Sequence, residues 1–169
     1  MDAVRYFVDQ LQREHALNKK VLAQVPEGKN AWKPHEKSME LGYLAALVAQ
    51  MPAWIALVLT TDELELTDPL AGNDLRPVAQ DSTEALLSSA DAALAKADSA
   101  MSHVSEDVWK GSWNLKIGGR VVSSASRLQQ VAENFTHSAH HRGQLTVYLR
   151  LLDATVPATY GPSADEKVG

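Results

Sequence analysis

Apolar residues recur every three or four positions along most of this chain, a spacing that predicts helices with one buried face. Four segments carry the pattern: residues 2–24, 38–60, 81–103 and 125–153. In the first, the apolar stripe is interrupted by two polar residues, His15 and Asn18. Helices of roughly 20 to 29 residues are about 30 to 43 Å long at ~1.5 Å per residue. Those proportions are typical of a helical bundle.

The second helical segment contains a proline, Pro52, that has no backbone N–H and therefore removes one helical hydrogen bond. We expect a kink between Val48 and Pro52. Such a bend either fits the helix to its neighbours, which is the simpler explanation, or marks a pocket or an interface.

The segments between the predicted helices are rich in helix-breaking residues. Residues 25–37 form a loop, and residues 61–80 read as a long surface connection. Gly118 and Gly119 suit the positive φ angles of a two-residue turn, so a small β-hairpin is expected between the third and fourth helices. Long connections permit either up-down-down-up or simple up-and-down wiring. Residues 154–169 should lie extended over the bundle before the chain end frays.

Composition and charge narrow the class of protein. The 169 residues, 45% apolar and 22% charged, predict a single domain over residues 1–169. A net charge of −5 argues against nucleic-acid binding. The absence of cysteine excludes disulfides and thiolate metal sites. No signal-like segment or long apolar run is present, so we expect a cytoplasmic protein that does not bind membranes.

The strongest chemical signal is a pair of histidines, His137 and His141, four residues apart on the last predicted helix. Their Cβ atoms would lie about 5–6 Å apart, side by side. Two such imidazoles can share a divalent metal ion at about 2.0–2.1 Å. The alternative is a pair of histidines that bind carboxylates and solvent. His140 points about 100° away from His141 and is expected at the surface or behind the site.

Three sequence strings resemble one family. The chain is similar to the DinB-like superfamily, whose members are often described as metal-dependent enzymes. The similarity lies in HSAHHRGQL, in the following VYLRLLDATVPATYGPSADE, and in WKPHEKSMELGYLAALVAQMPAW of the N-terminal half. The resemblance covers nearly the whole chain. It implies an all-α fold, a four-helix bundle with a crossover connection, frequently found as a homodimer.

The resemblance also implies a metal site of three histidines, one from the second helix and two from the fourth, that holds zinc or nickel with open positions. The last two ligands map onto His137 and His141. The first position is occupied here by Leu47, which has no lone pair for a metal. Loss of one of three imidazoles should weaken the site by orders of magnitude.

Several side chains are candidates for the rest of the site. Tyr43 and Gln50 share the helix face of Leu47, and Gln50 is the best substitute ligand among them. His15 is another possible donor, although a satisfied buried histidine is the more common situation. Glu133 and Gln144 are expected to orient the imidazoles.

Other residues are expected to shape the surroundings. Trp32 and Trp109 are candidates for a pocket rim, so the predicted pocket residues are Tyr43, Leu47, Gln50, Trp109 and Gln144. Trp54 and Trp113 fit core or hairpin packing. Arg142 and Gly143 are interpreted as structural, with Gly143 at a close helix crossing or a dimer interface. In the tail, Tyr160 should turn the chain back onto the bundle, and Asp165 and Glu166 are available for ion pairs.

Three functional hypotheses follow. The first is a metal-dependent transferase or hydrolase that acts on a small molecule, with zinc or nickel lowering the pKa of a low-molecular-weight thiol. The second, favoured by Leu47, is a binding or stress-related protein whose degenerate histidine site holds little or no metal. The third is a structural dimer without a ligand. The sequence leaves catalytic activity open.

Overall fold

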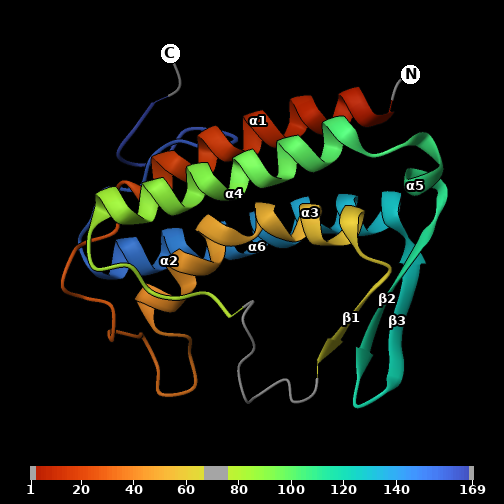
Figure 1. Ribbon diagram of the computed structural model, residues 1–169. Helices are drawn as coiled ribbons and strands as arrows, with labels where there is room; N and C mark the ends of the chain where they lie inside the picture. Colours follow the sequence, from red (N-terminus) through yellow and green to blue (C-terminus); the bar gives the residue numbers. More distant parts are fainter. Residues whose placement is uncertain (1–2, 67–75, 168–169) are drawn as a thin grey trace.

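A computed structural model describes residues 3–66 and 76–167 (Figure 1). Within these residues the helices are α1 (Ala3–Leu22), α2 (Leu41–Gln50), α3 (Pro52–Thr60), α4 (Thr83–His103), α5 (Glu106–Lys110) and α6 (Arg127–Leu151). The strands are β1 (Glu63–Leu66), β2 (Ser112–Ile117) and β3 (Arg120–Ser126). Three of the predicted helices therefore correspond to α1, α4 and α6, and the chain is mostly helical with a small sheet.

The long helices pack side by side, and their directions settle the wiring. α1 lies beside α4 and α6, and the line formed by α2 and α3 lies beside the same two helices. α1 and α4 run in opposite directions, because Lys19 bonds Asp91 while Gln12 bonds Asp98. Figure 1 shows α2, α3 and α4 running opposite to α1 and α6. Of the two wirings that the connections permit, the structure has up-down-down-up.

The expected bend lies at Pro52, but it divides the predicted helix 38–60 into two. Met51 ends α2 and begins α3, and Pro52 occupies the first turn of α3, where its missing N–H costs little. The two helices differ in direction by 50°. The Asn134 side chain of α6 donates a hydrogen bond to the Met51 carbonyl (3.2 Å), so the joint is held by a neighbouring helix.

Two hydrogen bonds also fix how α6 lies against α2. Besides the bond between Asn134 and Met51, the Tyr148 hydroxyl donates to the Met39 carbonyl (3.1 Å). Residues 134–148 of α6 therefore run antiparallel beside residues 39–51.

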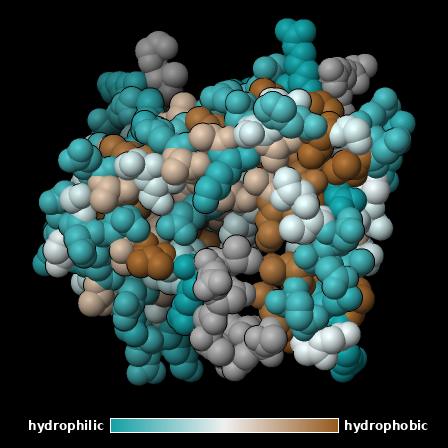
Figure 2. Space-filling model, in the orientation of Figure 1, coloured by the Kyte–Doolittle hydropathy of each residue, from teal (hydrophilic) through white to brown (hydrophobic). Residues whose placement is uncertain are grey.

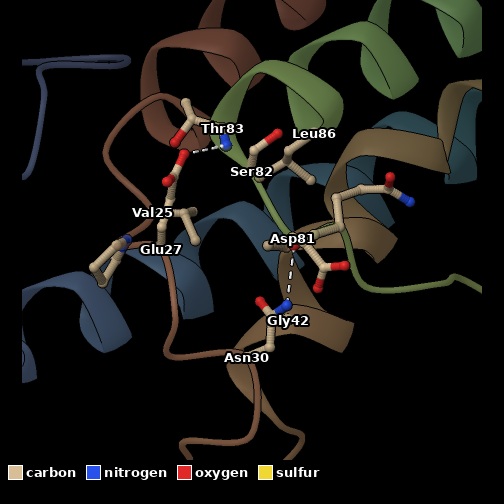
Figure 3. A pocket seen from close by; sticks show the side chains of 11 residues that line it. Val25, Glu27, Asn30, Gly42, Asp81, Ser82, Thr83 and Leu86 are labelled. Atoms are coloured by element: carbon tan, nitrogen blue, oxygen red, sulfur yellow. Dashed lines mark hydrogen bonds between the residues drawn. The ribbon is translucent and has the colours of Figure 1, made fainter.

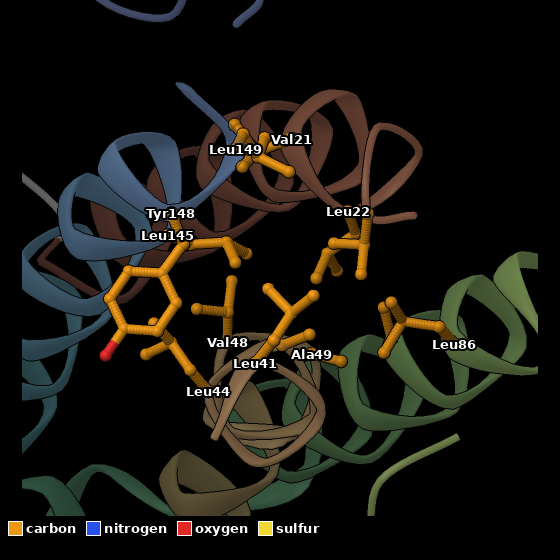
Figure 4. Close-up of a cluster of buried hydrophobic side chains, with 13 residues drawn as sticks. Val21, Leu22, Leu41, Leu44, Val48, Ala49, Leu86, Leu145, Tyr148 and Leu149 are labelled. Carbon is orange, nitrogen blue, oxygen red and sulfur yellow. The ribbon is translucent and has the colours of Figure 1, made fainter. Parts of the chain in front are cut away.

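Apolar side chains gather in two clusters toward opposite ends of the helices. The first apolar cluster, shown in part in Figure 4, comprises Val21, Leu22, Val25, Leu41, Leu44, Ala45, Val48, Ala49, Leu86, Ala90, Leu145, Tyr148 and Leu149. The second apolar cluster comprises Phe7, Leu11, Ile55, Val58, Leu59, Ala97, Ala100, Met101, Trp109, Trp113 and Val131. Both draw on α1, α4 and α6, while α2 supplies the first cluster and α3 the second.

The small sheet contains the predicted hairpin and one further strand. The predicted hairpin is present as β2 and β3, with positive φ at Gly118 (55°) and Gly119 (77°). A third strand, β1, pairs in parallel with β2, from Glu63 opposite Asn114 onward. Part of the predicted connection 61–80 is therefore a strand. The rest of that prediction, over residues 67–75, lies outside the described residues.

The tail folds back onto the helices as predicted. Asp165 pairs with Arg150 (2.8 Å) and Glu166 pairs with Lys20 (3.3 Å), so both carboxylates form the expected ion pairs. Pro157 and Ala158 are buried. The predicted frayed end, residues 168–169, lies outside the described residues.

Hydrophilic residues cover most of the face seen in Figure 2. In the described part of the chain, no single helix has the length and apolar character to cross a membrane, and the bent pair α2–α3 meets that test by length and composition only.

Candidate functional site

The histidine pair lies on α6 with its rings in contact. Nε2 of His137 and Nε2 of His141 are 2.8 Å apart, and the ring centroids are separated by 4.6 Å. His141 is 9% exposed, whereas His137 is exposed to solvent. The pair therefore spans the boundary between the interior and the surface, as one turn of a helix allows.

Gln144 sets the tautomer of the inner histidine. Its Oε1 accepts a hydrogen bond from Nδ1 of His141 at 2.8 Å. In a neutral imidazole one nitrogen donates and the other accepts, so the lone pair of His141 is on Nε2. That nitrogen faces Nε2 of His137. The hydrogen bond from His141 to Gln144 supports the predicted role of Gln144 in orienting the imidazole.

Burial favours the neutral form of both imidazoles. It lowers the pKa of His137, and the neighbouring His141 and His140 lower it further. Burial also lowers the pKa of His141, opposed by the hydrogen bond to Gln144. Neutral imidazoles carry the lone pair that a metal or a hydrogen-bond donor needs.

The surroundings of the pair are aromatic and aliphatic. The Trp54 ring of α3 meets His137 edge to face at 6.2 Å, so this tryptophan belongs beside the site rather than only to the core. Leu47 is 6% exposed. Because α2 and α6 are antiparallel, Leu47 lies at about the level of His137 to His141.

Two of the predicted pocket residues have partners away from α6. Gln50 donates to the Ser89 hydroxyl of α4 (3.3 Å), and the Tyr43 ring faces the Arg76 guanidinium at 5.5 Å. These contacts direct both side chains toward α4 and the segment before it. The structure therefore does not bring them to the histidine pair.

The tryptophans predicted at a pocket rim pack in the apolar clusters instead. Trp109 is buried and stacks on Phe7 with ring centroids 6.1 Å apart, in the second apolar cluster. Trp32 packs against the first apolar cluster, its ring edge to face with Tyr148 at 5.6 Å.

Two further candidates have other partners. Glu133 accepts a hydrogen bond from Gln129 (2.8 Å), so its contact is along the exposed side of α6. Nε2 of His15 lies 2.8 Å from the Asp91 carboxylate of α4.

These residues do not fit the three-histidine metal set that the resemblance implies. Two imidazoles on a tetrahedral ion would have their nitrogens about 3.3 Å apart, given bonds of about 2.0–2.1 Å. The observed 2.8 Å between His137 and His141 is instead a hydrogen-bond distance. Within residues 3–66 and 76–167, no three His, Cys, Asp or Glu side chains are grouped to hold an ion.

A small pocket lies at the start of α4, away from the histidines (Figure 3). Its volume is about 10 Å³, which suits a single water molecule. The Glu27 carboxylate accepts the Thr83 backbone N–H (2.8 Å), so this chain itself satisfies that helix end. Gly42 allows the loop to lie close to α2, because a Cβ at this position would be only 2.7 Å from Asn30 Oδ1.

A buried charged network on α6 was missed by sequence reasoning. Arg142, 1% exposed, donates to the Glu14 carboxylate (2.6 Å) and to Asn18 Oδ1 (2.7 Å), both on α1. The Tyr160 hydroxyl bonds Arg142 and donates to Glu14 (2.7 Å). Although 66% of Tyr160 is exposed, burial of its hydroxyl and the bond to Glu14 raise its pKa. The sequence did contain one signal for this network: Glu14 and Asn18 lie four residues apart beside the apolar stripe of the first helix.

Comparison with known proteins identifies the family. The model of the DinB family matches residues 2–167. This chain belongs to the DinB family. A DinB-like protein from Bacillus subtilis is 16% identical, with a TM-score of 0.66 over 89% of this chain and 93% of that one. A DinB-like protein from Bacillus cereus is 17% identical, with a TM-score of 0.67 over 91% and 95%.

At these identities, the likeness to the two solved structures concerns the fold. The search of curated proteins gives no match. The DinB-like resemblance read from the sequence is confirmed, and the function of this DinB-family protein must be argued from its own residues.

Proposed function

We propose that this DinB-family protein binds a small molecule at a degenerate histidine site that holds little or no metal. The observation that carries the proposal is the bond between the two Nε2 atoms, 2.8 Å apart, which makes each imidazole the partner of the other. Leu47 stands at the level of the pair and offers no lone pair. Trp54 and Leu47 supply apolar surface, while the imidazoles supply polar contacts, a combination that is common in small-molecule sites.

Metal analysis of untagged protein tests the first part of the proposal. We expect less than about a tenth of an equivalent of zinc or nickel in the wild type. Leu47→His should raise metal affinity by about tenfold or more, a gain of about 1.4 kcal/mol. Leu47→Asn, similar in size but without an imidazole, is the matched control and should leave the affinity unchanged. Adding His141→Ala to Leu47→His should remove the gain.

A thermal-shift screen with thiols and small electrophiles tests the second part. A ligand that binds the folded state alone raises the melting temperature, and the rise grows with the logarithm of its concentration relative to Kd. Stabilisation of the wild type that is lost in His141→Ala supports the proposal. If no compound stabilises the protein, the structural-dimer hypothesis replaces it.

The alternative is a zinc- or nickel-dependent transferase or hydrolase that uses a low-molecular-weight thiol. The lowered pKa values of both histidines favour it, since neutral imidazoles are metal ligands. Near-stoichiometric metal in the wild type that disappears in His141→Ala would establish this alternative and refute the metal-poor site.

The finer features of the fold and assembly are part of the same proposal. We treat α2 and α3 as one bent member of a four-helix bundle with a crossover connection, in a cytoplasmic homodimer. The exposed side of α6 supports the dimer, because Val147 and Leu151 are each 57% exposed there. Analytical ultracentrifugation of wild type and Val147→Glu tests it, with a monomeric variant expected.

A further inference from the structure

Buried polar residues of α1 and α6 form a layer between the two apolar clusters. This buried polar layer comprises Glu14, His15, Asn18, Ser138, His141 and Arg142. Its members meet across the two helices, because Glu14 bonds Arg142 (2.6 Å) and Asn18 donates to Ser138 (3.3 Å). In this layer each buried polar atom needs a hydrogen-bond partner, since bulk solvent does not reach it.

The ring orientation of His15 is fixed by a residue outside the layer, Asp91 of α4. Its Nε2 is 2.8 Å from the Asp91 carboxylate, to which Lys19 also donates two bonds of 2.9 Å. Hydrogen bonds from Lys19 and His15 keep the pKa of Asp91 below its usual value, so the carboxylate is ionised and only accepts. In the neutral ring, Nε2 of His15 therefore carries the hydrogen, and Nδ1 carries the lone pair.

That lone pair has no donor within residues 3–66 and 76–167. His15 is 7% exposed, and its Nδ1 is buried without a hydrogen-bond partner among the described residues. Trp109 Nε1, the other such atom there, is a donor in the second apolar cluster. Burying an unpaired acceptor is unfavourable, and a carboxylate that orients one imidazole nitrogen commonly prepares the other nitrogen for a ligand.

We propose that Nδ1 of His15 takes a hydrogen bond from a bound protic group, an O–H, N–H or S–H donor, inside the buried polar layer. The donor is either a water molecule or the donor group of a small molecule. A metal ion is disfavoured, because no three ligating side chains are grouped within the described ranges. This site is distinct from the bond between His137 and His141.

Nuclear magnetic resonance of the full chain with ¹⁵N-labelled histidine tests the proposal. We expect one tautomer for His15, with Nε2 protonated and Nδ1 shifted from the free-acceptor position by an accepted hydrogen bond. A cross-peak from the ring to a long-lived water identifies water as the donor. Displacement of the Nδ1 resonance by 2-mercaptoethanol or 1-propanol, but not by the non-donor 1,2-dimethoxyethane, identifies a small molecule.

Two results would overturn the proposal. One is protonation of Nδ1 in the wild type. The other is an Nδ1 resonance at the free-acceptor position that no probe moves.

Variants check the orienting role of Asp91. Asp91→Ala should populate both tautomers of His15, because the acceptor that fixes Nε2–H is gone. Asp98→Ala, a change on the same helix at a residue that bonds Gln12, should leave the single tautomer intact. If the probes shift the ring resonances of His141 but not those of His15, the histidine-pair proposal stands and this one is refuted. The two proposals therefore fail separately.

Discussion

Polar residues on two neighbouring faces of α6 differ in burial and in their hydrogen-bond partners. Toward α1, Arg142 is fully buried and bonds Glu14, Asn18 and Tyr160. Toward α3, His137 and His141 bond each other and stand beside an aromatic ring. The first face is a closed set of strong contacts between three parts of the chain. The second is small, partly solvated and held by short-range contacts along one helix.

We expect the face with Arg142 to contribute mainly to stability and the face with the two histidines to be the one able to contact a ligand. A buried ion pair whose remaining atoms are satisfied has no capacity left for a ligand, and breaking it is costly. A pair of neutral imidazoles can exchange its internal hydrogen bond for one to a ligand at small cost. Mutations on the two faces should therefore have different consequences.

The largest effect is expected for Arg142→Met. The substitution leaves the Glu14 carboxylate buried without its cation, which should cost about 3–5 kcal/mol of unfolding free energy. Urea denaturation followed by circular dichroism measures it.

The matched double variant Glu14→Leu/Arg142→Met should recover most of that loss, because apolar groups of similar size often replace a buried ion pair without penalty. Arg150→Met, which breaks an exposed pair with Asp165, should cost far less. Equal losses at Arg142 and Arg150 would contradict the distinction between buried and exposed contacts.

A smaller effect of opposite sign is expected on the solvent face of α6. Gly143→Ala should stabilise the fold by about 1 kcal/mol, because glycine is a poor helix former and the new methyl group meets no atom within 4 Å. Gly42→Ala should destabilise it, since the methyl group would press on Asn30. Thermal unfolding compares the two, and a destabilised Gly143→Ala would mean that this position is covered in solution.

The histidine face should respond to acid. The pKa values of His137 and His141 are lowered in the folded state, so the unfolded chain binds protons first as the pH falls below about 6.5. Their contribution to stability is complete above that pH and declines as the pH falls through the folded-state pKa values. The double variant His137→Asn/His141→Asn should flatten the stability profile between about pH 7 and pH 5. An unchanged slope would show that other groups control it.

The arginine face should respond to alkali, with the smallest effect. The raised pKa of Tyr160 means that the unfolded chain loses its phenolic proton first. The contribution is complete below about pH 10 and disappears as the pH rises through the folded-state value. Tyr160→Phe should flatten the decline in stability above about pH 10. Identical alkaline profiles for wild type and Tyr160→Phe would remove this role.

Local patterns predicted most of the helices and the histidine pair. The apolar spacing located α1, α4 and α6, Pro52 located the bend, and four-residue spacing on a helix sufficed to place His137 beside His141. β1 was missed because Glu63–Leu66 is a four-residue strand next to a turn-rich segment, and its partner β2 begins 49 residues after β1 starts, at Ser112.

Long-range contacts were beyond the sequence pattern. The ion pair of Glu14 and Arg142 joins residues 128 positions apart, and the direction of Gln50 depends on whether α4 or α6 lies over its face of α2. Periodicity shows that a face is buried but not which neighbour covers it. The predicted pocket therefore included Tyr43 and Gln50, whose partners lie on α4 and in the segment before it rather than on α6.

The shared residue between α2 and α3 makes two units of what looks like one long apolar segment. Met51 ends α2 and begins α3. The helix that carries Leu47 and the helix that leads into the sheet are therefore separate units that meet at this residue. Lengthening α3 would displace the strands while leaving the helix opposite the histidines in register.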